Sequence, residues 1–166
     1  MSTINGVTMV TDRTTADTEA LAALNRKNWA TMTTAEKNLW NAQKGAYNIG
    51  DLNRVGAAAN YVYAQLVAAG YTVSDYTTLK TDWQGTNVPT NTQLDTYITS
   101  IRALWLVFDG CPYPISYDIK HGLTTDDANN IEETLVWVLD QIVVVTSVLV
   151  NEDGDAITFG GDRIIV

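Results

Sequence analysis

The sequence TTDDANNIEETLVWVLDQIVVVTSVL, which runs from Thr124 to Leu149, decides the fold. Its apolar residues recur at alternating steps of three and four, which is the spacing of a heptad seam along one side of a helix. The seam comprises Ala128, Ile131, Leu135, Val138, Ile142, Val145 and Leu149. From Leu135 onward the other faces are apolar too, and such a helix is expected to be surrounded by protein. The pattern predicts either the central helix of a bundle or the contact helix of an oligomer.

The two ends of this segment differ in how clearly the sequence marks them. Thr124 can cap a helix, and Asp126 and Asp127 suit the positive end of the helix dipole. At the other end, Val143–Val150 is rich in β-branched residues, which also favour strands. We therefore expect a helix that begins at Thr124, and the sequence leaves its end open.

Length and composition fit an ordinary globular chain. The 166 residues, of which 46% are hydrophobic, suffice for one domain, or one domain with a small appendage, without disulfides or a metal. The first ten residues lack the basic start and apolar core of a secretion signal, and Val143–Val150 is too short to cross a bilayer. Neither secretion nor membrane association is expected.

The net charge of −9 comes from the second half of the chain. Residues 1–83 hold seven acidic and seven basic residues, whereas residues 84–166 hold twelve acidic and three basic ones. An acidic surface repels phosphates, so nucleic-acid binding is not expected, while solubility or a basic protein partner is. The lone Cys111 excludes an internal disulfide and fits a reducing cytoplasm.

Helical patterns account for most of the remaining chain. We expect helices over residues 11–30, 33–43, 48–69, 90–108 and 124–149. The predicted caps are Thr14 or Thr15, Thr33 with Glu36, Asn48 or Asp51, Thr90 with Gln93, and Thr124 at the five starts, and Gly70 at the end of the third helix. The expected fold is mainly α, a bundle of four to five helices over residues 11–149.

Short β-rich ends flank this expected bundle. Residues 1–10 form an arm with an Asn5-Gly6 turn and one strand near Val7–Val10. Residues 150–166 predict a small C-terminal β-meander with strands at Ala156–Phe159 and Arg163–Val166. Such a meander is marginal alone, so we expect it to pack on the bundle, the arm or another subunit.

Aromatic residues provide the candidates for surface contacts. Leu39 and Trp40 are the expected anchors of the second helix. Four tryptophans lie on or beside apolar helix faces and are predicted to be core residues: Trp29, Trp40, Trp105 and Trp137. Trp83, Tyr113 and Tyr117 lie in expected loops and are better contact candidates than the other aromatics, although a core position or anchoring of those loops remains the favoured interpretation.

Residues that suggest chemistry have simpler interpretations. The carboxylates of Asp126, Asp127, Glu132 and Glu133 could work as acid and base or hold a divalent cation, but a helix start with a solvated face explains them. Residues 151–155 resemble a calcium loop that lacks the required glycine and final glutamate, so a hairpin turn is favoured. Cys111 and His121 lack any surrounding nucleophile signature. We expect no catalytic residues, no metal and no cofactor.

Several motifs, in their order along the chain, are similar to those of one family. They are Thr11-Asp12-Arg13-Thr14, Thr33-Thr34-Ala35-Glu36-Lys37, Lys44-Gly45-Ala46-Tyr47-Asn48-Ile49-Gly50-Asp51-Leu52-Asn53-Arg54-Val55, Thr81-Asp82-Trp83 with Val88-Pro89-Thr90, and Leu123-Thr124 through Glu132. The chain resembles small structural proteins or modules from phages and prophages of Gram-positive bacteria, found among tail, baseplate and fibre genes. The resemblance covers residues 11–142. It implies a virion component that acts by assembly and brings no catalytic residues.

These observations define the functional expectations. The first is a phage structural protein of the tail, baseplate or fibre, made in the host cytoplasm, with other virion proteins and copies of itself as partners. A homotrimer is the expected assembly, and the seam from Ile131 to Leu149 is its expected contact. One alternative is a capsid decoration or head-fibre base protein, which the short tail favours over receptor binding. The other is an intracellular, host-directed binding protein.

Overall fold

The computed structural model describes residues 2–42, 44–45, 47–84, 89–115 and 123–148, and the side chains up to residue 142. Within these residues the α-helices are α1 (Thr15–Asn25), α2 (Thr34–Ala42), α3 (Ile49–Ala68), α4 (Asn91–Trp105) and α5 (Thr125–Val148). A 3-10 turn, η1, covers Trp29–Thr31, and the strands are β1 (Thr3–Ile4) and β2 (Val7–Thr8). The prediction of a mainly α fold is confirmed. The predicted β-meander lies outside the described residues.

Each α-helix begins at a capping box, in which a side chain and a residue three positions later exchange hydrogen bonds. The pairs are Thr14–Asp17, Thr33–Glu36, Asn48–Asp51, Thr90–Gln93 and Thr124–Asp127. Where the sequence allowed two caps, Thr14 and Asn48 hold the position. Local polar chemistry therefore sets where the helices begin.

Helix ends differ more from expectation. The first helix ends at Asn25, and the chain continues through η1 before α2 begins. The β-branched segment up to Val148 stays helical, which resolves the open end of α5. Gly70 ends α3 as predicted, with φ of 90° and the Tyr71 amide donating to the Leu66 carbonyl at 2.9 Å.

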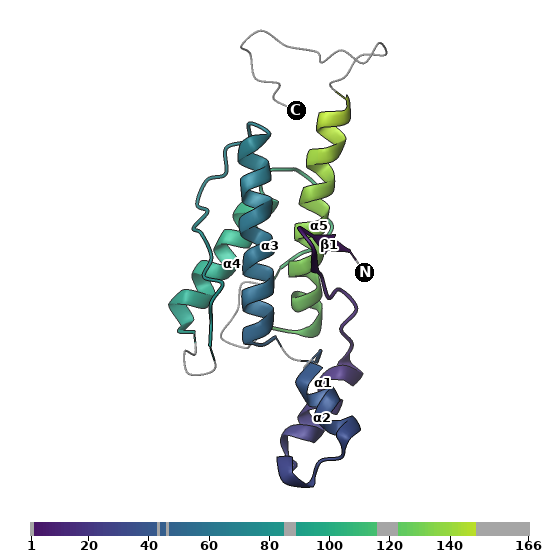
Figure 1. The fold of residues 1–166 in the computed structure, drawn as a ribbon. Coiled ribbons are helices and arrows are strands. Elements are labelled where there is room, and N and C mark those ends of the chain that lie inside the picture. Colours follow the sequence, from purple (N-terminus) through teal and green to yellow (C-terminus); the bar gives the residue numbers. More distant parts are fainter. Residues whose placement is uncertain (1, 43, 46, 85–88, 116–122, 149–166) are drawn as a thin grey trace.

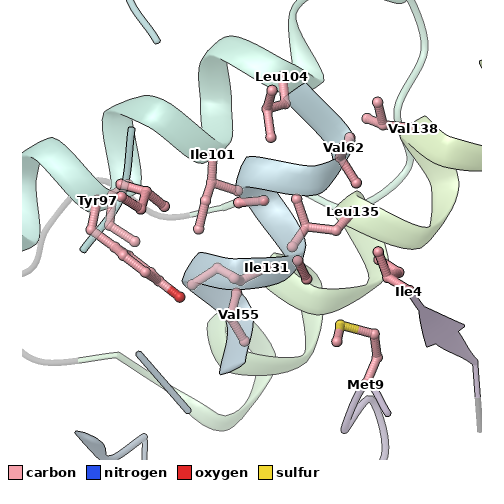
Figure 2. Packing of buried hydrophobic residues seen from close by; sticks show 14 of the residues in the cluster. Ile4, Met9, Val55, Val62, Tyr97, Ile101, Leu104, Ile131, Leu135 and Val138 are labelled. Atoms are coloured by element: carbon pink, nitrogen blue, oxygen red, sulfur yellow. The ribbon is translucent and has the colours of Figure 1, made fainter. Parts of the chain in front are cut away.

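The main core lies among α3, α4 and α5 (Figure 1). Figure 2 shows Ile131 and Leu135 of α5 among side chains of α3 and α4, including Val55 and Ile101. The largest fully buried members of this core are Ile4, Met9, Val55, Val62, Leu66, Ile101, Leu104, Ile131, Leu135 and Val138. The heptad pattern of α5 is thus satisfied within one chain, as a helix of a bundle.

The N-terminal arm folds as a β-hairpin against this core. Asn5 and Gly6 both have positive φ angles, 48° and 76°, as a two-residue hairpin turn requires. The turn pairs Ile4 with Val7 in an antiparallel register. Ile4 and Met9 are buried in the core cluster (Figure 2). The arm predicted to hold one strand therefore holds two and completes the bundle.

Helices α1 and α2 form a separate hairpin, which we call the α1–α2 hairpin (residues 14–45). It projects beyond the end of the bundle at which α3 and α5 begin (Figure 1). Leu21, Leu24 and Met32 are its buried apolar residues, and they lie outside the main core cluster. The α1–α2 hairpin therefore packs outside the core that α3, α4 and α5 share.

The base of the α1–α2 hairpin is tightly joined. Thr18 donates its hydroxyl proton to the Gly45 carbonyl at 3.0 Å, and Lys44 pairs with Asp12 at 3.1 Å. A Cβ on Gly45 would lie 2.2 Å from the Asp17 carbonyl oxygen, so only glycine fits this crossing. This close approach holds the segment after α2 against the start of α1 at the base of the hairpin.

Candidate assembly surface and the buried ion cluster

Four charged side chains meet between the N-terminal arm, α3 and α5. Arg13 Nη2 lies 2.9 Å from Asp51 Oδ1 and 2.7 Å from Glu132 Oε1. Arg54 also pairs with Asp51 and with both oxygens of Glu132, at 2.8 Å for Oε1. Two guanidinium groups and two carboxylates thus share one network, which we call the ion cluster. Its formal charges sum to zero.

Backbone groups of the N-terminal segment complete the ion cluster. The Val10 amide donates to Glu132 Oε2 at 2.6 Å, and Arg54 donates to the Thr8 carbonyl at 2.9 Å. Beside them, Asn129 Nδ2 donates to the Arg13 carbonyl at 2.9 Å and its Oδ1 accepts from the Arg13 amide at 3.0 Å. The cluster therefore fastens residues 8–13 across α3 and α5.

Because the ion cluster is buried, each of its charges needs a partner of opposite charge. Glu132 is 0% exposed, and a buried charge costs several kcal/mol, about 3–5, when its partner is removed. Burial alone would lower the pKa of Arg54, but its hydrogen bonds to Glu132 and Asp51 raise that pKa instead. Both Glu132 oxygens already accept hydrogen bonds, so this carboxylate has no free oxygen with which to take a proton from a substrate.

Two tyrosines extend the polar centre towards α4. The hydroxyls of Tyr47 and Tyr97 hydrogen-bond to each other, and the Arg13 guanidinium lies 5.6 Å from the Tyr47 ring centre. Burial raises the pKa of both hydroxyls, although the hydrogen bond from Tyr97 opposes this for Tyr47. Both tyrosines are therefore neutral at pH 7 and act as packed, hydrogen-bonded links.

The four carboxylates noted in the sequence do not converge on one site. Asp127 accepts from Thr124 in the capping box, whereas Glu132 lies in the ion cluster. Asp126 is exposed and Glu133 is half-buried. The interpretation of Glu132 as part of a solvated face is wrong, since α3 and the arm cover it. Within the described residues, no three His, Cys, Asp or Glu side chains gather as a metal site requires.

The predicted contact aromatics occupy different environments. Trp83 is only 8% exposed and its amide donates to Asn53 Oδ1 at 2.7 Å, so it anchors its loop on α3. Tyr113 is half-buried, and its hydrogen bond to Glu133 raises its pKa. Cys111 Sγ lies 3.9 Å from Thr134 Oγ1. Tyr117, His121 and residues 151–155 lie outside the described residues.

The expected assembly seam is largely interior. Ile131, Leu135, Val138 and Ile142 are all buried within the single chain. The side chains of Val145 and Leu149 lie outside the described part. These four seam residues thus pack on the chain's own α3 and α4, so among the described side chains an exposed contact surface lies on other faces.

Such a surface lies on the α1–α2 hairpin. Trp29 and Leu39 are 48% and 46% exposed, so the predictions that Trp29 is a core residue and that Leu39 anchors α2 are wrong. Trp29 packs edge-on against Trp40 with ring centres 5.5 Å apart, and the Lys37 ammonium lies 5.4 Å from the Trp29 ring centre. Trp40 is fixed by its indole N–H, which donates to Asn25 Oδ1 at 2.9 Å.

The short length of the α1–α2 hairpin explains this exposure. An apolar pattern at helical spacing indicates a buried face only where another element covers it. Here α1 and α2 cover only Leu21, Leu24 and Met32, and among the described helices none packs extensively on this hairpin. Lys37 lies against Trp29, whereas Leu39 is two residues from Lys37, about 200° around α2. We call the exposed surface formed by Trp29 and Lys37 the hairpin face.

Comparison of the chain with models of known families, with curated proteins and with solved structures found no match. Among the described helices, none has both the length and the apolar character needed to cross a bilayer.

Proposed function

We propose that this chain is a structural component of a phage particle, in the tail, baseplate or fibre, that works by assembly with copies of itself and with other virion proteins. It performs no reaction in this proposal. The alternative is a capsid decoration or head-fibre base protein. It would use the same contact surface and differ only in its location in the particle. The sequence resemblance described above is one support for it.

The observation that carries the proposal is the hairpin face. The bundle buries the α5 seam as far as Ile142, yet the α1–α2 hairpin presents a half-exposed tryptophan outside it. Aromatic residues are enriched at protein contacts, and this one is held on a projecting, ordered element.

Protein composition of purified particles tests the proposal. Mass spectrometry of particles from cells that carry this gene should find the chain at a fixed copy number. Light scattering of the isolated protein should give a mass above that of one chain, with a trimer expected. A chain that is absent from particles and monomeric at high concentration would instead favour the intracellular, host-directed alternative.

A matched pair of variants ties the result to the surface. Trp29→Ser should reduce both the solution mass and incorporation into particles. Leu106→Ser is the control, because Leu106 is 69% exposed but lies on the bundle. Equal behaviour of the two variants would remove the hairpin face as support for the proposal.

A further inference from the structure

The tip of the α1–α2 hairpin carries excess positive charge. Between Asn25 and Trp40 the chain has the bases Arg26, Lys27 and Lys37 and one acid, Glu36. Lys27 pairs with Glu36. Within the described residues Arg26 and Lys37 form no ion pair, and Lys37 lies against the exposed Trp29 ring. The hairpin face is therefore apolar with two uncompensated cations beside it.

The outer side of α5 carries the opposite charge. The sequence from Thr125 to Val148 contains no lysine or arginine. Asp126, Glu133 and Asp140 follow one another at intervals of seven, so they lie on one side of the helix. Each stands two residues from a seam position, about 200° around the helix, which places this acidic stripe opposite the buried seam.

These carboxylates are available to a partner. Asp126 and Asp140 are exposed, Glu133 is half-buried beside Tyr113, and none of the three forms an ion pair within the described part of the chain. The stripe extends over about 21 Å of helix, at about 1.5 Å per residue. Helix α2, with nine residues, is about 14 Å long and fits within that length.

A chain cannot bring its own hairpin face to its own stripe. The α1–α2 hairpin projects past the start of α5 and away from its length (Figure 1). Thr18 in α1 approaches Thr125 at 3.4 Å, so the base of the hairpin, and not its tip, lies beside α5 among the described residues. The two surfaces therefore do not meet within one chain.

We infer that the hairpin face of one copy docks on the acidic outer side of α5 in a second copy. This inference rests on the proposed function and names its self-contact. Trp29 supplies the apolar contact, and Arg26 and Lys37 meet Asp126 and Asp140, which sets the register. The two surfaces differ, so the contact is head-to-tail, and a head-to-tail contact whose rotation closes gives a ring such as a trimer.

Charge exchange in the full-length chain tests this contact. Arg26→Glu with Lys37→Glu, and separately Asp126→Lys with Asp140→Lys, should each weaken self-association at least about tenfold, since like charges then face each other. The four changes in one chain should restore assembly. Asp95→Lys with Asp109→Lys makes the same change in charge at exposed acids outside α5 and should leave assembly unaltered. Sedimentation measures the dissociation constants, and circular dichroism verifies that each variant is folded.

Rescue by the four-change chain, with the control unaltered, supports the contact. Folded single-sided variants that assemble as the original chain does, or a four-change chain that stays dissociated, would overturn it. If the chain assembles and occurs in particles but charge exchange has no effect, the proposed function stands and this contact is wrong. A chain that is monomeric and absent from particles removes both.

Discussion

The bundle and the α1–α2 hairpin have similar sequence patterns, but apolar residues that the pattern predicts to be buried are buried in the bundle and partly exposed in the hairpin. Both have helices with apolar residues at helical spacing and capping boxes at their starts. In the bundle, α3, α4 and the N-terminal arm cover one side of α5, and its seam is buried from Ala128 to Ile142. In the hairpin, two short helices cover little, so Trp29 and Leu39 stay exposed. The number of covering elements, rather than the pattern, decides whether an apolar face is core or contact surface.

The same substitution in both regions gives the largest contrast. Leu135→Asp places an unpaired charge where the native side chain is 0% exposed, and we expect loss of more than about 5 kcal/mol, enough to unfold a typical domain. Leu39→Asp changes a side chain that is 46% exposed and should leave stability within about 0.5 kcal/mol. Thermal unfolding at equal, dilute protein concentration measures both. A comparable loss of stability in the two variants would mean that the Leu39 side chain is covered in the single chain.

Neighbouring acids on α5 give the next contrast. Glu132→Gln removes the charge that both Arg13 and Arg54 contact, and we expect a loss of about 3–5 kcal/mol. Glu133→Gln is the matched control, because Glu133 is half-buried on the outer side and forms no ion pair within the described residues. Denaturant unfolding measures the two free energies. Equal values would show that the ion cluster does not hold the arm to the bundle.

Local chemistry made much of the fold predictable. Thr33, Thr90 and Thr124 each precede an acceptor three residues later, and each begins a helix. The seam around Ile131 and Leu135 indicated a central helix, and it is one. These features depend on residues within a few positions of each other, which a single sequence displays directly.

The ion cluster was not predictable in the same way. It joins Arg13, Arg54 and Glu132, residues that are up to 119 positions apart. One signal was available: Glu132 follows the seam residue Ile131 on a helix without any basic residue, so a buried carboxylate there needs cations from elsewhere. Which of the chain's arginines would supply them depends on the tertiary fold.

The tryptophans show the limit of pattern most clearly. Trp29 was expected in the core because of its neighbours in sequence, yet it is half exposed. Trp83 was a contact candidate because of its loop, with anchoring of that loop as the favoured interpretation, and it is buried. Asn53 of α3 bonds the Trp83 backbone in both directions, at 2.7 and 2.9 Å, and draws that loop inwards. Long-range hydrogen bonding of this kind leaves no local mark in the sequence.

Lowering the pH is expected to have the smallest effect on stability, and the effect acts selectively on the α1–α2 hairpin. The Lys27 side chain and the Thr33 amide donate to Glu36 and lower its pKa from 4.5 to about 2. This carboxylate therefore stabilises the α1–α2 hairpin fully above pH 4.5, and the contribution disappears as the pH falls towards 2. Hydrogen bonds from Thr14 also lower the pKa of Asp17. The stabilising contribution of this carboxylate is therefore also lost as the pH falls.

The indole N–H of Trp40 reports on this acid response, because it is bonded to Asn25 across the two helices. In nitrogen-15 spectra we expect its resonance to move between pH 4.5 and pH 2. Glu36→Gln should remove the Glu36 part of that movement, whereas Glu19→Gln, an exposed acid on α1, should retain it. If Glu36→Gln titrates like the original chain, the Lys27–Glu36 pair does not hold the hairpin together. The tip would then be held by the packing of Trp29 on Trp40. The hairpin would in that case depend on aromatic packing, whereas the bundle depends on its ion cluster.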